Sequence, residues 1–295
     1  SAMKNKKIFL PILGLLSGLF ISCEKNNTPA EASSVLSIST AEVLTRSSKD
    51  AFIQGDKIGV FVLDENSGMY NGSESCWNNR ATLETAWHLE KDIYLSSKPG
   101  TVHAYYPYHE NVSSTQIQIE SASQTDFLFS RGIVVNAENP DVTLQMKHAL
   151  SLVKFVIKQE GYVGEGKISG VSLQGVNREG ILDICTGEIT IQKTGNEAYK
   201  GDFILNDSPL AIGIIALPQT ITSTTVMLLL DGERYGFKLP EGAWEQGKET
   251  TYTLGINSVE KKLFQIGTST IDSWGAGGTY EGDLTPGIDI GTEID

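Results

Sequence analysis

Basic residues and cysteines are both scarce in this sequence of 295 residues. It contains 23 Lys and Arg against 36 Asp and Glu, which gives a formal net charge of −13, and it has only three Cys. An acidic chain repels the phosphate backbone, so composition excludes a nucleic-acid partner. So few cysteines also exclude a disulfide framework in a chain of this length.

Motifs for catalysis and cofactor binding are missing as well. The stretch "GEGKISG" at 164–170 lacks the spacing of a nucleotide-binding loop, and no G-x-S-x-G nucleophile turn occurs. His103 and His109 flank "AYYPY", but a metal ion needs three or four converging ligands and the sequence suggests no others. We therefore expect a protein without enzymatic activity, cofactor or metal.

The longest apolar run lies near the N-terminus, over residues 8–21. Three lysines precede it, Pro11 interrupts it, and it is shorter than the roughly 20 residues that span a bilayer. This pattern predicts a secretion signal over residues 1–22, which includes two vector-derived residues ahead of the natural start at Met3. Removing it takes away three lysines and no acid, so the net charge changes from −13 to −16.

Cys23 follows a small residue and several aliphatic ones, a pattern that resembles the lipobox of bacterial lipoproteins. The resemblance implies that the Cys23 thiol carries acyl chains, and two or more chains are what stable membrane anchoring requires. Residues 23–33 are polar and read as a tether. Cys76 and Cys185 are far apart in sequence, so we expect both to be free thiols.

The remainder of the chain carries the pattern of an all-β protein. Segments rich in Val, Ile, Thr, Phe and Tyr are separated by Gly, Asn, Asp or Pro about every 8 to 12 residues, and no convincing helical period occurs. Asp231–Gly232, between "VMLLL" and "RYGFKL", predicts a hairpin with a type I′ turn. The turn residues "NAENPD" at 136–141 suggest a boundary between two β-sandwiches, at 34–141 and 142–274.

The tryptophans allow two interpretations. They could form a platform on which sugars stack, but alternation places most of them on strand faces, where aromatic side chains usually belong to the core. The core is the interpretation we favour, with Trp77 in the polar loop "YNGSESCWNN" as the best exception. The full set is Trp77, Trp87, Trp244 and Trp274.

Several segments in this order resemble the fimbrillin-like subunits of Bacteroidetes type V pili. The lipobox leader comes first and a strand ending in "LTR" comes second. The following segments are "FIQGDKIGVFV", "YYPY", "QTDFLFS", "VTLQMKHALSLVKFVIK", "ALPQT" and "TSTIDSW". The similarity runs from Cys23 to Trp274.

The resemblance implies a fold, a location and an assembly route. Subunits of this family have two tandem β-sandwich domains of transthyretin-like topology and are exported as lipid-anchored precursors to the outer membrane. An arginine-specific protease then cuts after an arginine that follows the first strand. The first strand is lost, and a segment of another subunit takes its place in a surface fimbrium that serves cell adhesion.

Arg46 and Ser47 match the cleavage position. They lie in the polar stretch "TRSSKD", where an exposed loop would give a protease access, while Lys49 would not suit an arginine-specific enzyme. The displaced strand would contain Leu36 and Ile38, which share one strand face. The sequence does not identify a receptor.

Residues 275–295 have an acidic, Gly-rich composition that predicts a flexible tail. The same tail has apolar residues at even positions, as a donor strand with one apolar face would. Leu284, Ile288 and Ile290 lie on that face, and Pro286 would need an edge or bulge position. Both interpretations of the tail stay open. So does the alternative of a surface adhesin or glycan-binding lipoprotein that never polymerises.

Overall fold

The computed structural model describes residues 33–44, 51–275, 279–288 and 290. Within these ranges the chain is built from β-strands, with two short 3-10 turns and no α-helix, so the predicted all-β class is confirmed. None of the described helical segments has the length and apolarity that a membrane crossing requires. The predicted lipidation and cleavage residues lie outside the described residues: Cys23, Arg46, Ser47 and the alternative Lys49.

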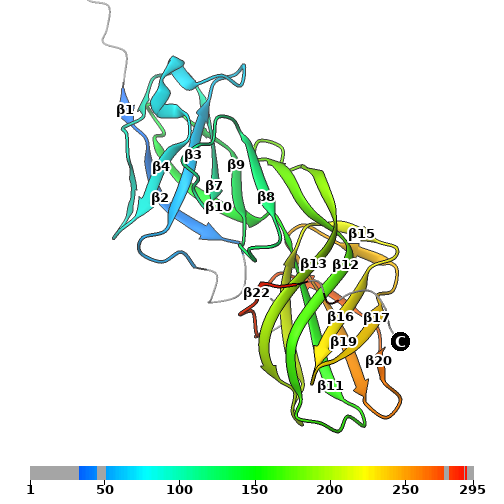
Figure 1. Cartoon of the computed structure of the whole chain (residues 1–295). Helices are drawn as coiled ribbons and strands as arrows, with labels where there is room; N and C mark the ends of the chain where they lie inside the picture. Colours follow the sequence, from blue (N-terminus) through cyan, green and yellow to red (C-terminus); the bar gives the residue numbers. More distant parts are fainter. Residues whose placement is uncertain (1–32, 45–50, 276–278, 289, 291–295) are drawn as a thin grey trace, which may run out of the picture. The chain divides into compact units, whose positions relative to one another are not determined.

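The N-terminal half forms a seven-stranded sheet (Figure 1). Apolar side chains on one face of the sheet pack into a first buried cluster. A two-stranded pair, β1 (Ser34–Val35) with β6 (Tyr94–Leu95), and the turns η1 (Tyr70–Gly72) and η2 (Glu74–Cys76) lie in the same half of the chain. In order across the sheet, the strands are β2 (Ser37–Val43), β10 (Asp141–His148), β9 (Leu128–Val135), β7 (Gly100–Tyr106), β3 (Lys57–Leu63), β4 (Asn79–Leu83) and β5 (Trp87–Leu89).

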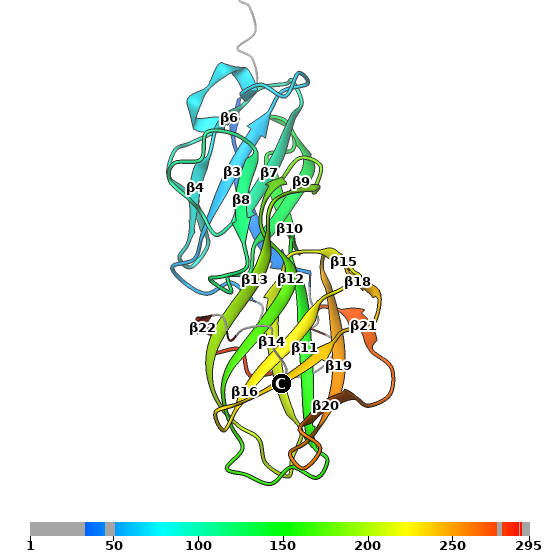
Figure 2. The same ribbon diagram turned by 45° about the vertical axis from the view of Figure 1, so that its right-hand side comes forward.

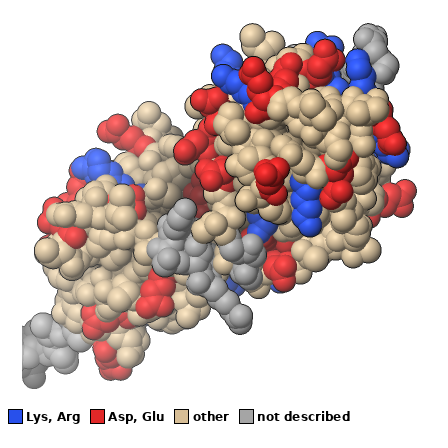
Figure 3. Space-filling view, turned by 90° about the horizontal axis from the view of Figure 1, so that it is seen from below, with Lys and Arg blue, Asp and Glu red and all other residues tan. Residues whose placement is uncertain are grey.

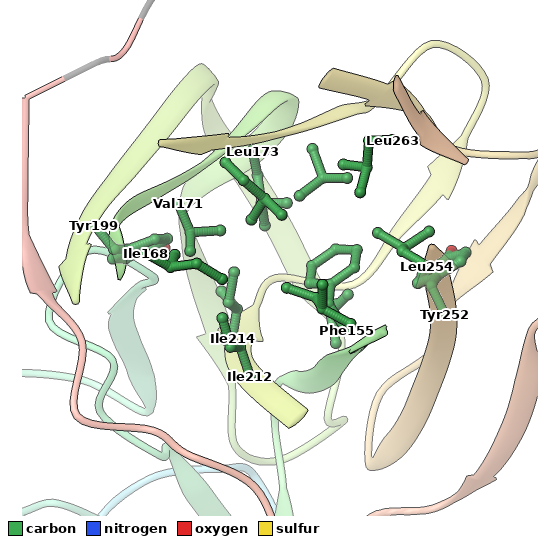
Figure 4. Packing of buried hydrophobic residues seen from close by; sticks show 14 of the residues in the cluster. Phe155, Ile168, Val171, Leu173, Tyr199, Ile212, Ile214, Tyr252, Leu254 and Leu263 are labelled. Atoms are coloured by element: carbon green, nitrogen blue, oxygen red, sulfur yellow. The ribbon is translucent and has the colours of Figure 1, made fainter. Parts of the chain in front are cut away.

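The C-terminal half forms two further sheets that enclose a second core (Figure 4). The first contains β14 (Leu210–Ala216), β11 (Ser151–Gln159), β19 (Lys248–Asn257) and β20 (Lys262–Gln265), and β21 (Thr270–Ser273) also pairs with β19. The second contains β17 (Glu233–Lys238), β16 (Thr225–Leu230), β12 (Lys167–Asp183), β13 (Ile189–Ile204) and β22 (Thr285–Pro286), and β8 (Gln116–Glu120) also pairs with β12. A short pair joins β15 (Gln219–Ile221) to β18 (Gly242–Trp244).

Strands β12 and β13 are unusually long and run side by side (Figure 2). The end of β12 pairs with β8, and together they contribute to a third buried cluster that also contains Phe61 and Phe129 of the seven-stranded sheet. Apolar side chains from both halves of the chain therefore pack together in this third cluster.

The strand pairing does not divide at the boundary predicted between residues 141 and 142. Strand β10 begins at Asp141 but pairs with β2 and β9, and β8 pairs with β12. The stretch "NAENPD" is a local turn in which Asn136 and Asn139 form an isolated bridge. We therefore propose that the N-terminal sandwich extends to about His148 and that β8 belongs with the C-terminal strands.

The hairpin at Asp231–Gly232 is confirmed. Their φ angles are 49° and 80°, as a type I′ turn requires, and Leu230 pairs with Glu233 across it. The Asp231 carboxylate accepts hydrogen bonds from Tyr162 Oη, from the Gly166 N–H at 2.9 Å and from the Lys167 N–H at 2.8 Å.

The tryptophans belong to the core, as we favoured from the sequence. Trp87, Trp244 and Trp274 are at most 9% exposed. Trp77 is half-buried, meets Phe61 edge-on at 5.2 Å, and donates its indole N–H to the Ser113 carbonyl at 3.0 Å. All four side chains therefore lie in or against the buried clusters.

Candidate functional site

The first strand segment is held at two places. Strand β1 pairs antiparallel with β6, and the Leu36 N–H donates to the Ile93 carbonyl at 2.9 Å. Strand β2 then pairs parallel with β10, from Ser37 opposite Asp141 to Val43 opposite Met146. The segment thus lies at one end of the seven-stranded sheet, with β10 as its neighbour in the ladder.

Two side chains of this segment reach the N-terminal core. Leu36 is 3% exposed and Ile38 is 5% exposed, whereas the serines beside them face solvent. Both pack in the cluster that contains Val142, Leu144 and Met146 of β10. Burial of a Leu or Ile side chain contributes roughly 1.5–3 kcal/mol, so these two residues are the main apolar attachment of the strand.

The edge of β2 that does not pair with β10 borders a groove of about 550 Å³. Ala41 and Val43 of β2 line it together with Phe52, Leu83 and Trp87. Phe52 meets the Trp87 ring edge-on at 5.3 Å. Because the groove follows β2, the strand has a ladder partner on one side and a partly apolar depression on the other.

The arginines differ in their surroundings. Arg46 lies between the described ranges that end at Leu44 and begin at Ala51. The other four all lie within strands, where a protease cannot draw the backbone into its cleft without local unfolding. They are Arg80 in β4, Arg131 in β9, Arg178 in β12 and Arg234 in β17. Arg80 and Arg234 have ladder partners, whereas Arg131 and Arg178 fall at register shifts in their ladders.

The C-terminal segment packs against its own chain between residues 279 and 288, so the flexible tail suggested by composition is wrong for this part. The Glu281 N–H donates to the Ala211 carbonyl at 2.8 Å, and the Glu281 carbonyl accepts from the Gly213 N–H at 3.0 Å. Further along, β22 pairs with β13, and the Gly287 N–H donates to the Ala198 carbonyl at 2.8 Å.

The even-numbered apolar residues of this segment do not share one buried face in the described chain. Leu284 is 6% exposed and joins the C-terminal core, but Ile288 is 80% exposed and Pro286 also faces solvent. The Ile290 side chain is half-buried near Gly170. Pro286 does lie on an edge strand, as its missing N–H requires.

Tyr280 fits a notch that sequence reasoning missed. Its ring lies over Gly213 so closely that a Cβ on Gly213 would be 2.2 Å from Tyr280 Cδ2. The available signal was a glycine in the middle of the apolar strand "LAIGIIA", because such a glycine often marks a close approach of another group.

The first strand and the C-terminal segment share a second cavity, of about 230 Å³. Val43 and Phe52 of the N-terminal half line it, together with Trp274 and Tyr280 of the C-terminal half. Trp274 also stacks on the buried His148 ring, with 4.1 Å between the ring centroids. The end of β2 and the start of the C-terminal segment therefore line the same cavity.

Burial shifts the pKa of several side chains outside this region. Burial raises the pKa of the Cys76 thiol to about 11 and raises that of Cys185 as well, and both are free thiols as predicted. Burial also lowers the pKa of His103. Among the described residues, no three His, Cys, Asp or Glu side chains converge as metal ligands would. Acidic side chains are spread over the face in Figure 3, with basic side chains among them.

Comparisons with known proteins identify the family of this chain. The fimbrillin-like family profile matches residues 45–274. Comparison with curated proteins gives no significant sequence match.

Several solved structures share the fold. A candidate cell adhesion protein from Bacteroides ovatus has a TM-score of 0.64 and 20% identity, over 83% of this chain and 98% of that one. One from Bacteroides uniformis has a TM-score of 0.63 and 17% identity, over 83% and 100%. A fimbrial protein from Bacteroides vulgatus has a TM-score of 0.55 and 14% identity, over 81% and 99%. Because its family profile covers most of the sequence, the chain belongs to the fimbrillin-like family.

Proposed function

We propose that this protein is a structural subunit of a surface fimbrium and that it contributes to cell adhesion. In this proposal it is exported with a lipid on Cys23, is cut between Arg46 and Ser47, and assembles when a strand from another subunit replaces its first strand. The observation that supports it best is the first strand itself, which lies at the end of its sheet and buries Leu36 and Ile38.

Loss of this strand would create a binding site. The β10 edge would then present unpaired backbone N–H and C=O groups, and the space left by Leu36 and Ile38 would be apolar. Unpaired backbone groups beside an apolar groove bind an added strand through ladder hydrogen bonds and side-chain pockets. A second copy of this chain, or a related subunit, would supply that strand.

Limited proteolysis tests the cleavage step. An arginine-specific protease applied to the folded protein without its leader should yield one dominant product that starts at Ser47. The four arginines in paired strands should survive, because cutting there first requires local unfolding. An Arg46→Lys variant is the matched control and should resist the enzyme. Preferential cutting at any other arginine would contradict the assembly proposal.

The donor role of the C-terminal segment has its own test. Deleting residues 280–295 should leave a folded protein that cannot polymerise after cleavage. Ile288→Asp should also block polymerisation, because it would put a charge into an apolar groove. Ile288 is 80% exposed here, so this variant should unfold at the same denaturant concentration as wild type. Normal polymers from both variants would refute the donor role of the C-terminal segment.

Replacing Cys23 tests the lipid anchor. Cys23→Ala should leave an unprocessed precursor that fails to reach the outer membrane, since the acyl chains are attached to that thiol. Mass spectrometry of the native precursor should find acyl mass at Cys23. Correct localisation of the variant would refute the lipoprotein assignment but would leave the strand-exchange proposal in place.

A further inference from the structure

The pairing of β2 with β10 contains a break. Val142 lies opposite Ile38, but the next residue, Thr143, lies opposite Thr40, so Ser39 has no partner in the ladder. An extra residue of this kind is a bulge, and bulges are rare in parallel pairs. Parallel pairing is also slightly less stable per residue than antiparallel pairing. The resident strand therefore holds its place through an interrupted ladder.

The bulge reverses the alternation of β2. Ile38 points inward, Ser39 and Thr40 both face solvent, and Ala41 and Val43 are then the partly buried residues. Strand β10 has no such interruption, because its residues alternate strictly between exposed and buried from Asp141 to His148. The resident strand must bulge to follow a neighbour that alternates regularly.

Most of strand β10 is held in the sheet only by the strand that pairs with its outer edge. Its ladder with β9 involves only Lys147 and His148, and residues of both strands, including Thr143 and Gln145, line a depression of about 130 Å³. Residues 141–146 pair with β2 alone among the described strands. A strand with a complete ladder would therefore hold this part of β10 better than β2 does.

The C-terminal segment has the alternation that β10 needs. Leu284, Pro286, Ile288 and Ile290 occupy even positions without a parity change. The N–H groups of odd and even residues point to opposite edges of a strand. In β2, which runs parallel to β10, the solvent-facing Ser37 donates its N–H to the Pro140 carbonyl on the β10 side. A segment in the same direction with its even residues inward would therefore place the missing N–H of Pro286 on the edge away from β10. The odd residue Gly287 donates to β13 in the present arrangement, which shows that this edge of the segment can pair.

We propose that the β10 edge selects its partner by unbroken alternation, and that the segment 284–290 of a second copy fits it better than the resident first strand does. Ser39 is the residue that weakens the resident strand. This inference rests on the proposed strand exchange and names what drives it: exchange replaces an interrupted ladder with a continuous one.

A competition experiment tests the inference without relying on cleavage at Arg46. The recognition site of a sequence-specific protease is inserted between Ser47 and Ser48, and the full chain is folded and then cut there. Synthetic peptides compete with the resident fragment, and native mass spectrometry measures which one is bound. The peptides are residues 33–44, the same peptide without Ser39, residues 279–291, and residues 279–291 with a serine inserted after Pro286.

The peptide without Ser39 should displace the resident fragment at about a tenfold lower concentration than the unaltered peptide, a difference of about 1.4 kcal/mol in binding free energy. Residues 279–291 should also displace it, and the version with the inserted serine should fail because its alternation changes parity. Equal potency with and without Ser39, or no displacement by any peptide, would overturn the inference. Failure of an arginine-specific protease to cut at Arg46 would refute only the proposed processing.

Discussion

Gly213→Ala should release the C-terminal segment without disturbing the sandwich beneath it. The new Cβ would be 2.2 Å from Tyr280 Cδ2 and 2.6 Å from Cε2. Carbon atoms in contact are normally about 3.5 Å apart or more, so the ring must move by over about 1 Å. The backbone of the next residue, Glu281, is fixed by two hydrogen bonds, so the ring cannot move that far unless the segment moves with it.

The expected magnitude follows from the cost of overpacking. Forcing extra atoms into a close contact costs about 1–3 kcal/mol, which lowers the free energy of opening the segment by that amount. Amide protection at Glu281 and Gly287 should therefore fall by roughly fivefold to 150-fold in hydrogen exchange, since about 1.4 kcal/mol is a factor of ten. The amides of the central strand β11 should exchange as in wild type.

Two further variants make the result specific. Gly242→Ala is the matched control, because a Cβ at Gly242 meets no atom within 4 Å, and it should leave exchange unchanged. Adding Tyr280→Ala to Gly213→Ala should restore part of the lost protection by removing the clash, giving a coupling of about 0.5–3 kcal/mol. Unchanged protection at Glu281 in Gly213→Ala, or no recovery in the double variant, would refute the notch.

Three other predictions concern stability. Leu36→Ala with Ile38→Ala should destabilise the uncut protein in urea by about 2–5 kcal/mol per residue, and should have no effect once the first strand has been cut and lost. Desolvation alone would raise the pKa of Asp231, but hydrogen bonds from Tyr162 and three backbone amides lower it below its ordinary value. The advantage of wild type over Asp231→Asn should therefore be complete above about pH 4 and disappear as the pH falls through the lowered pKa. Lys154→Met should cost about 3–5 kcal/mol, because it leaves the carboxylate of Glu249 buried without the Lys154 ammonium, and Glu249→Leu should restore most of that loss.

Short-range patterns in the sequence predicted local structure well. The Asp231–Gly232 turn depends only on two residues that tolerate positive φ, so it could be read directly. Leu36 and Ile38 are two residues apart in an alternating segment, which is enough to place them on one face, and both are buried. These features depend only on residues that are close together in the sequence, so the sequence alone is enough to predict them.

Features that depend on distant partners could not be read in this way. The stretch from Asp141 to Gln159 looks like one continuous strand, but it divides at Ala149 and Leu150 and its halves join different sheets. The Ser39 bulge exists only because β10 imposes its own alternation on β2. The notch at Gly213 required knowing that Tyr280 would lie over it.

The direct passage from β10 into β11 has a mechanical consequence. Only Ala149 and Leu150 separate the two strands, and both are completely buried. Strand β11 lies between β14 and β19 and is held by a ladder on each side. Tension applied to a strand seated on β10 would pass along a few covalent bonds into the middle of the C-terminal sheet, where it would have to shear two ladders at once. A fibre built through this edge would carry its load on the backbone rather than on a flexible joint between domains.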